Sequence, residues 1–181
     1  LVILLGTGLR ISELCGLTSD DVDLARRVVR VDHQLLKAKR GNGLYIDKPK
    51  TKCGVREVYL SEKVAMAFCR VLAREQPREP IVIDGRKGFL FFNKRGKPMT
   101  GQTYATAFRN MVKNYRKGDP LPDVVTPHTM RHTFCTRMAL AGMNPKNLQY
   151  VMGHSNIEMT LGYYAHASSE TAMEEMRRIS A

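Results

Sequence analysis

The sequence predicts an α+β fold that is mostly α-helical, with a small three-stranded antiparallel sheet at one edge. Apolar residues recur at helical spacing along most of the chain, whereas three short β-branched or alternating runs lie close together between residues 28 and 60. With 181 residues, the chain is long enough for one well-buried core and too short for two comfortable ones. We therefore expect a single compact domain over residues 1–181.

Two short helices and the sheet account for the first third of the chain. The run from Leu1 to Leu5 predicts the last turns of a buried helix that Gly6 and Gly8 stop, and a second short helix begins at Ile11. The predicted strands are residues 28–31, 44–46 and 55–60. They are connected by a turn at residues 41–43 and a basic hairpin loop at residues 48–54.

Helices predominate in the rest of the chain. An amphipathic pattern predicts a helix over residues 61–76, which Pro77 and Pro80 end, and a basic helix is expected over residues 102–117. Between them, two apolar runs predict short strands at residues 81–83 and 89–92. Four further helical segments are expected at about residues 127–141, 145–152, 156–165 and 169–179.

The charge of the chain favours a polyanionic partner. The formal net charge is +12 and the pI is about 9.8. Residues 26–56 hold ten Lys or Arg against two Asp, and residues 86–117 hold nine Lys or Arg with no acidic residue. Two segments this one-sided favour a surface that follows phosphates, although charge alone does not separate nucleic acid from an acidic membrane surface.

The sequence gives no indication of a metal site or a membrane span. The cysteines are scattered, without a C-x-x-C pair or a nearby histidine at metal-ligand spacing, so we interpret them as reduced thiols. The apolar run at the start of the chain is too short to cross a bilayer, and its flanks do not resemble a signal peptide. Because this run begins without an initiator methionine, we expect a piece of a longer protein. The lack of a membrane span and of a signal peptide predicts that it is soluble and cytoplasmic.

The segment around residue 130 is the most informative one. Thr126 suits the N-cap and Pro127 the first position of a helix, so His128 and Arg131 are expected one turn apart near a partly positive helix start. An anion binds well at such a place. Two further clusters in the sequence supply Arg10, His154 and the doublet Tyr163-Tyr164.

Five short motifs occur in the order found in the tyrosine recombinase, or phage integrase, family. They are Gly-Thr-Gly-Leu-Arg-Ile-Ser-Glu-Leu at 6–14, Lys-Thr-Lys-Cys-Gly-Val-Arg at 50–56, His-x-x-Arg-His at 128–132, Gly-His at 153–154 and Tyr-x-His at 164–166. Over nearly its whole length the chain resembles the catalytic domain of that family and its fold, without the first helix of that domain and the DNA-binding domains that usually precede it. The phrase Met-Gly-His-Ser-Asn-Ile-Glu-Met-Thr-Leu further resembles integrases of conjugative transposons and temperate phages.

The resemblance implies a site-specific recombinase that integrates or excises a mobile element through a covalent 3′-phosphotyrosine intermediate. Arg10 and Arg131 would clamp the scissile phosphate, because a guanidinium binds phosphate oxygens bidentately. His128 and His154 would add hydrogen bonds, and His128 would also take the proton of the attacking phenol. Tyr164 would attack phosphorus. The implied chemistry needs neither a cofactor nor a metal, since cationic side chains stabilise the developing charge.

Two assignments leave alternatives. Either tyrosine of the doublet could be the nucleophile, since relatives differ by one residue in the gap after the Gly-His histidine; the Tyr-x-His register favours Tyr164 over Tyr163. The proton donor for the leaving 5′ oxygen is Lys50 or Lys52. Family hairpins place this acid just before the turn into the final strand, which favours Lys52 and leaves Lys50 as a phosphate contact.

Several neighbouring residues are assigned to the fold instead of the chemistry. We expect His132 to brace its helix through a buried hydrogen bond and His166 to brace the tyrosine segment. Arg10 has a structural alternative, which is to cap the carbonyl groups at the end of the first helix. The expected core residues of the helix that follows Thr126 are Met130, Phe134, Met138 and Leu140.

The expected partner is double-stranded DNA at specific recombination sites, bound by two to four copies of the chain with accessory DNA-bending or excision factors and no membrane. The expected DNA contacts are Lys37, Lys39, Arg40, Lys50, Arg56, Lys94, Arg95, Lys97, Arg109 and Lys113. Residues 166–181 are expected to form a tail helix that docks either on a neighbouring protomer or on its own core. The alternative functions are a type IB topoisomerase-like enzyme and a non-enzymatic basic DNA-binding module.

Overall fold

A computed structural model gives the structure of the chain. It describes residues 1–40, 43–49, 52–75, 79–115 and 125–164, together with the isolated positions 173, 176, 177 and 180. Four expectations lie outside this range: the start of the turn at 41–43, Lys50 with the side chain of Lys52, His166, and the tail helix at 169–179. In the described part of the chain, no helix combines the length and the apolar character that crossing a membrane requires.

The described helices are short, and most of them match the expected segments. They are α1 (Val2–Thr7), α2 (Ile11–Gly16), α3 (Glu62–Leu72), α4 (Gly101–Tyr115), α5 (Pro127–Leu140), α6 (Pro145–Met152) and α7 (Glu158–Leu161), with 3₁₀ turns η1 (Ser19–Asp21) and η2 (Lys52–Gly54). α7 is shorter than the expected 156–165, since Ile157 is its N-cap and Gly162 its C-cap, and residue 165 lies outside the described range. The mostly helical α+β class is confirmed.

The three-stranded antiparallel sheet exists and includes two of the three expected strands, but its third member differs from the expected one. It consists of β1 (Val22–Asp23), β2 (Val28–Val31) and β5 (Arg56–Tyr59), with β2 in the middle. Residues 44–46 do form a strand, β4 (Leu44–Asp47), but it pairs with β3 (Gln34–Lys37) in a separate hairpin. β3 was not expected; its Leu35 is fully buried against Cys15 and Phe89, which holds the hairpin onto α2.

The other two expected strands, at 81–83 and 89–92, are present only as isolated bridges. Phe89 pairs with Thr18, Phe92 pairs with Pro98, and Ile83 pairs with Arg86. Phe89 is fully buried. Ile83 and Phe89 of these runs are buried with Cys15 of α2, and the runs do not form a ladder of paired strands.

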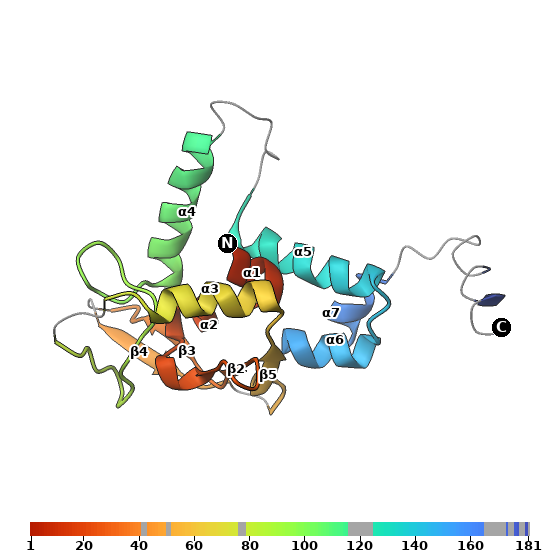
Figure 1. Cartoon of the computed structure of the whole chain (residues 1–181), viewed down its shortest axis with the longest axis horizontal. Coiled ribbons are helices and arrows are strands. Elements are labelled where there is room, and N and C mark those ends of the chain that lie inside the picture. Colours follow the sequence, from red (N-terminus) through yellow and green to blue (C-terminus); the bar gives the residue numbers. More distant parts are fainter. Residues whose placement is uncertain are drawn as a thin grey trace.

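Two cores place the helices relative to the sheet. The larger one joins α1 and α3 to the inner face of the sheet through residues such as Leu4, Val29 and Phe68. The smaller one joins α5 to α6 through Phe134, Cys135, Leu148 and Met152. Figure 1 shows α5, α6 and α7 at one end of the molecule and the β3–β4 hairpin at the other. Of the four core residues expected on α5, Met130 and Phe134 are buried and Met138 is partly buried, whereas Leu140 is 75% exposed because it ends the helix.

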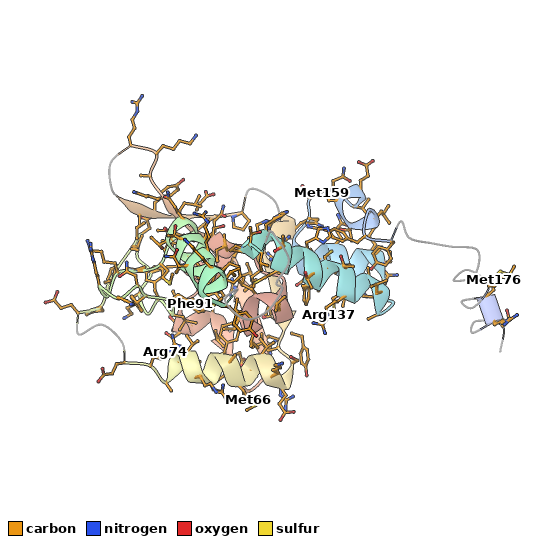
Figure 2. The ribbon with its side chains drawn as sticks, turned by 90° about the horizontal axis from the view of Figure 1, so that it is seen from above. Met66, Arg74, Phe91, Arg137, Met159 and Met176 are labelled. Atoms are coloured by element: carbon orange, nitrogen blue, oxygen red, sulfur yellow. The ribbon has the colours of Figure 1, made fainter. Side chains whose placement is uncertain are left out.

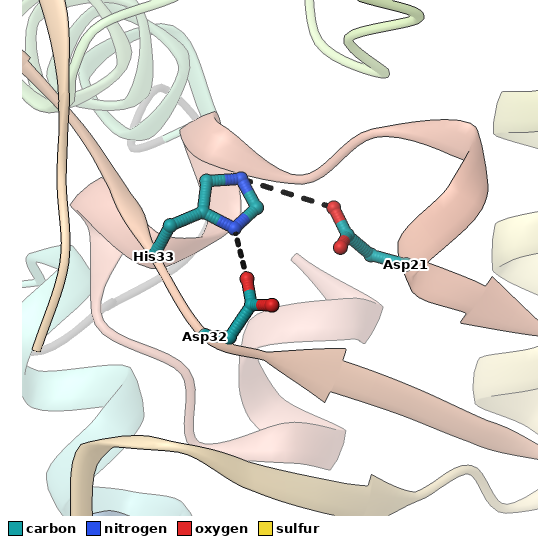
Figure 3. A group of neighbouring side chains, drawn as sticks. All are labelled: Asp21, Asp32 and His33. Carbon is teal, nitrogen blue, oxygen red and sulfur yellow. Dashed lines mark hydrogen bonds and ion pairs between the residues drawn. The ribbon is translucent and has the colours of Figure 1, made fainter. Parts of the chain in front are cut away.

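A buried polar cluster fixes the loops beneath the sheet (Figure 3). The Nδ1 atom of His33 lies 2.6 Å from Asp32 and its Nε2 atom lies 2.7 Å from the carbonyl oxygen of Gly16. Arg86 donates to Asp21 at 3.3 Å and to Asp32 at 2.8 Å. Asp21, Asp32 and His33 have the mutual spacing of metal ligands. Because Arg86 pairs with both carboxylates and Arg30 also lies 3.3 Å from Asp32, we interpret the cluster as a structural one, which the sequence analysis missed.

Candidate active site: an arginine-rich pocket

A cavity of about 360 Å³ brings together most of the residues singled out in the sequence. It lies between the start of α2, one face of α5, the end of α6 and the segment around α7. Its lining residues are Arg10, Ile11, Pro127, His128, Arg131, His132, His154, Met159 and Tyr163. In Figure 2, Met159 on α7 lies on the opposite side of the molecule from Met66 on α3, so the cavity and the outer face of α3 are well separated.

The start of α5 places its two cavity residues as the sequence predicts. Thr126 is the N-cap and accepts a hydrogen bond from the backbone N–H of Thr129, while the Thr129 hydroxyl accepts one from the N–H of Thr126. Pro127 occupies the first helical turn. His128 and Arg131 consequently face the cavity together, one turn apart.

Backbone carbonyl groups hold both arginines of the cavity. Arg131 is 7% exposed and donates to the carbonyl oxygens of Gly8 at 2.6 Å and Met152 at 2.5 Å. Arg10 donates to the carbonyl oxygen of Gly153 at 2.9 Å and to the Glu13 carboxylate at 2.8 Å. Arg10 therefore does not cap α1, whose terminal turn is closed by the N–H of Gly8 bonding to Leu4. Each guanidinium keeps further N–H groups for a ligand.

The charge of this site is concentrated and only partly compensated. Three guanidinium groups, those of Arg10, Arg56 and Arg131, surround one buried carboxylate, that of Glu13. Burial, followed by the positive charge of Arg10, lowers the pKa of Arg131 to about 10, so this arginine remains charged at neutral pH. A site with two uncompensated positive charges favours binding of a phosphate.

His154 is neutral at physiological pH. Its side chain follows the α6 cap residue Gly153, is 4% exposed, and lies with Nδ1 3.0 Å from the hydroxyl oxygen of the fully buried Thr160. Burial first, and the nearby charge of Arg131 next, lower the pKa of His154 to about 4. A neutral imidazole held this way can donate one N–H hydrogen bond into the cavity without adding a further positive charge beside the arginines.

The structure corrects the assignment of His132. This residue was expected to make a buried hydrogen bond, but its side chain is exposed, lines the cavity and lies with its ring centroid 4.8 Å from that of Tyr163. The physical reason is helical periodicity, because His132 stands four residues after His128 on the same face of α5. The spacing of the two histidines was the signal that could have identified it.

The tyrosine doublet is split between two environments. Tyr163 lines the cavity beside the arginines. The hydroxyl group of Tyr164 donates instead to the carbonyl oxygen of Met143, and its ring packs against the α5–α6 core. Burial raises the pKa of both phenols. The structure therefore brings Tyr163, and not Tyr164, next to Arg10 and Arg131.

Eight of the ten expected DNA contacts are exposed, and they belong to β3 and the turn after it, to the segment before α4 and to α4 itself, which Figure 1 shows. They are Lys37, Lys39, Arg40, Lys94, Arg95, Lys97, Arg109 and Lys113. Lys50 lies outside the described residues. Arg56 was wrongly expected at the surface: its side chain is 0% exposed and forms a salt bridge with Glu13 at 2.8 Å. The reason is strand alternation, which turns Arg56 and Val58 of β5 to the inner face.

Comparison with known proteins gives a consistent result. Residues 1–171 match the phage integrase family. The transposase of transposon Tn916 from Enterococcus faecalis is 50% identical over 182 residues, which cover 99% of this chain and 44% of that protein. The tyrosine recombinase XerC of Herpetosiphon aurantiacus is 34% identical over 174 residues, which cover 96% of this chain and 49% of that protein.

Solved structures agree with this result. The integrase of transposon Tn1549, determined in complex with circular intermediate DNA, superposes with a TM-score of 0.91 at 55% identity, covering 98% of this chain and 58% of that one. The chain spans about half the length of the curated relatives it matches, or somewhat less. Both the match to residues 1–171 and the identity to the Tn916 and Tn1549 proteins support one conclusion. The chain belongs to the phage integrase family of tyrosine recombinases.

Proposed function

We propose that this chain is the catalytic part of a conjugative-transposon integrase, which cleaves and rejoins DNA through a covalent 3′-phosphotyrosine intermediate. The observation that carries the proposal is the cavity itself. It presents two arginines and three histidines, of which His128 and His154 are the expected pair, and backbone oxygens fix its guanidinium groups. Such preorganised donors stabilise the charge that builds on a phosphate during displacement.

We assign each residue a role in this reaction. Arg10 and Arg131 bind the non-bridging oxygens of the scissile phosphate with the N–H groups that the backbone leaves free. His154 adds a hydrogen bond as a neutral donor. His128, exposed at the mouth of the cavity, takes the proton of the tyrosine phenol, whose oxygen then attacks phosphorus. The bond from phosphorus to the 5′ oxygen breaks, and that oxygen takes a proton from Lys52; reversal of these steps rejoins the strand.

We assign the nucleophile to Tyr164, although Tyr163 lies in the cavity. Two observations support the assignment. The Tyr-x-His register includes Tyr164 and not Tyr163. In addition, the Tn1549 integrase has been solved with the arginine at its position 225 replaced by lysine, and with the tyrosine at its position 379 replaced by phenylalanine. These positions are 154 apart (379 − 225), which is also the separation of Arg10 and Tyr164 (164 − 10). The proposal requires the hydroxyl of Tyr164 to leave the Met143 carbonyl when DNA is bound.

The Tn1549 structures hold transposon-end and circular-intermediate DNA, which supports double-stranded DNA of a mobile element as the substrate here. We further propose that two to four copies of the chain assemble on that DNA in the bacterial cytoplasm, with accessory bending or excision factors. Strand exchange between two duplexes would separate this function from that of a type IB topoisomerase, which relaxes supercoils only.

The test is formation of a covalent adduct. Incubated with a nicked duplex that carries a candidate attachment site, the protein should form a denaturation-resistant DNA adduct in the presence of a metal chelator. Tyr164→Phe should abolish the adduct and leave DNA binding intact, whereas Tyr163→Phe, the matched control, should retain the adduct. The reverse outcome would move the nucleophile to Tyr163, and an absolute need for a divalent metal would contradict the mechanism.

A further inference from the structure

Arg56 is the largest fully buried side chain among the described residues. Its Nε atom donates to the carbonyl oxygen of Val151 at 2.7 Å, its Nη2 atom to the Glu13 carboxylate at 2.8 Å, and its Nη1 atom both to Glu13 and to the carbonyl oxygen of Gly54 at 3.2 Å. Arg56 is paired and hydrogen-bonded, but replacing a buried ion pair with apolar residues of similar volume is often neutral or stabilising, so stability alone does not explain this side chain.

The explanation lies in what Arg56 shares with the cavity. Its partner Glu13 is also the partner of Arg10. Moreover, three consecutive carbonyl oxygens at the end of α6 each accept a hydrogen bond from a different arginine. Val151 accepts from Arg56, Met152 from Arg131 and Gly153 from Arg10. The C-terminus of a helix carries partial negative charge, so it can hold several cations side by side.

We propose that Arg56 is a positioning residue for strand cleavage: it holds the Glu13 carboxylate and the end of α6 in place, so that Arg10 and Arg131 present their free N–H groups to the scissile phosphate. This inference rests on the proposed function. Arg56 itself does not touch DNA, since its side chain is completely buried. It acts by competing with Arg10 for Glu13.

Removing Arg56 changes the environment of Arg10 in a definite direction. Glu13 then has one guanidinium partner left, that of Arg10, only 39% of whose side chain is exposed. The Glu13 carboxylate then attracts the Arg10 guanidinium more strongly and draws it away from the phosphate. In addition, the carbonyl oxygen of Val151 in α6 loses the hydrogen bond from Arg56. We expect the rate of cleavage to fall and the affinity for DNA to stay the same, because a displacement of about 1 Å at a reacting group can cost about 10²-fold in rate.

The experiment compares Arg56→Met, Arg56→Lys and a matched control, Arg26→Met. Arg26 also forms a salt bridge with a glutamate, Glu57 at 3.0 Å, but its side chain is 63% exposed. Single-turnover adduct formation and DNA affinity over a range of salt concentrations are measured at equal folded fraction. Arg56→Met should slow adduct formation by about 10²-fold with unchanged affinity and salt dependence. Arg56→Lys should be slowed as well, because an ammonium group cannot reach all three acceptors.

A second substitution separates positioning from general support of the fold. Adding Glu13→Gln to Arg56→Met removes the uncompensated carboxylate and releases Arg10, so the double variant should form adduct faster than Arg56→Met alone. If Arg56→Met does not fold, the rate of adduct formation by Arg56→Lys is compared with that of Arg56→Lys combined with Glu13→Gln instead.

Three results would overturn the inference: wild-type cleavage by Arg56→Lys or Arg56→Met, loss of DNA affinity with a weaker salt dependence, or a further loss of rate when Glu13→Gln is added. If the unmodified protein forms no adduct at all, it is the proposed function that fails.

Discussion

Replacing Gly153 by alanine should lower the free energy of unfolding by more than the strain of a left-handed backbone conformation accounts for. Gly153 ends α6 with φ +61°, and a Cβ atom there would lie 2.8 Å from Nη1 and 3.0 Å from Cζ of Arg56. That guanidinium cannot move aside easily, because three acceptors hold it. The substitution therefore adds a steric clash to the strain of a left-handed residue.

The chain contains a matched control for the strain alone. Gly142, which follows α5, has φ +79°, and a Cβ atom there would meet nothing within 4 Å. A left-handed residue other than glycine costs about 1–2 kcal/mol, which is the whole effect expected for Gly142→Ala. Overpacking a rigid site adds about 1–3 kcal/mol, so we expect about 2–5 kcal/mol for Gly153→Ala.

Urea unfolding of the two variants and the parent protein measures both costs. Combining Gly153→Ala with Arg56→Met should remove most of the additional cost, because the clashing group is then a flexible thioether. If Gly153→Ala and Gly142→Ala cost the same, the guanidinium yields freely. In that case Arg56 is not the rigid support that the positioning argument requires.

Two further predictions concern proton transfer and pH. The cleavage rate of Lys52→Ala should be severely reduced on normal DNA and largely restored on DNA with a 5′-bridging sulfur, because that sulfur leaves without a proton donor. Lys50→Ala should show a milder, salt-sensitive loss of rate without such rescue. Selective rescue of Lys50→Ala would move the acid to that residue. Folding disfavours protonation of His154, since its pKa of about 4 lies below the ordinary value of 6.5, so its stabilising contribution is complete above about pH 6.5 and declines toward pH 4. When the pH falls from 7 to 5, the free energy of unfolding of the parent protein should therefore decrease by about 2 kcal/mol more than that of His154→Gln. An identical pH dependence of the two proteins would contradict the neutral imidazole.

The helices and most of the cavity could be predicted from the sequence because their signals are local. Thr126 and Pro127 fix where α5 begins, and helical spacing then puts His128 and Arg131 on one face. The pairing of β4 with β3 could not be predicted with the same ease. It depends on where Leu35 is buried, which is a property of the assembled core and not of the strand itself.

Charge misled the prediction where burial decides the role. Arg56 stands in a basic segment and was grouped with surface contacts, yet alternation along β5 turns it inward. His132 was assigned to the interior and lies at the cavity. In both cases the residue type gave no information about which way the side chain points. The neighbouring residues did give it: apolar Val58 follows Arg56 on the same face of the strand, and His128 precedes His132 by one helical turn. The doublet Tyr163-Tyr164 shows a different limit, because adjacent residues point to different sides whatever their type.

The arginines of the cavity are oriented mainly by oxygen atoms of the main chain, those of Gly8, Met152 and Gly153. Every amino acid carries such an oxygen, so replacing these three residues cannot delete the acceptors and can only displace them. At these three positions, the orientation of the clamp thus depends on the path of the backbone and not on the side chains of the three residues themselves. Two of the three positions have φ above +60°, where glycine alone is unstrained. Substitutions at Gly8 and Gly153 should therefore disturb the clamp more than a substitution at Met152, although none of the three residues contributes a side chain to it.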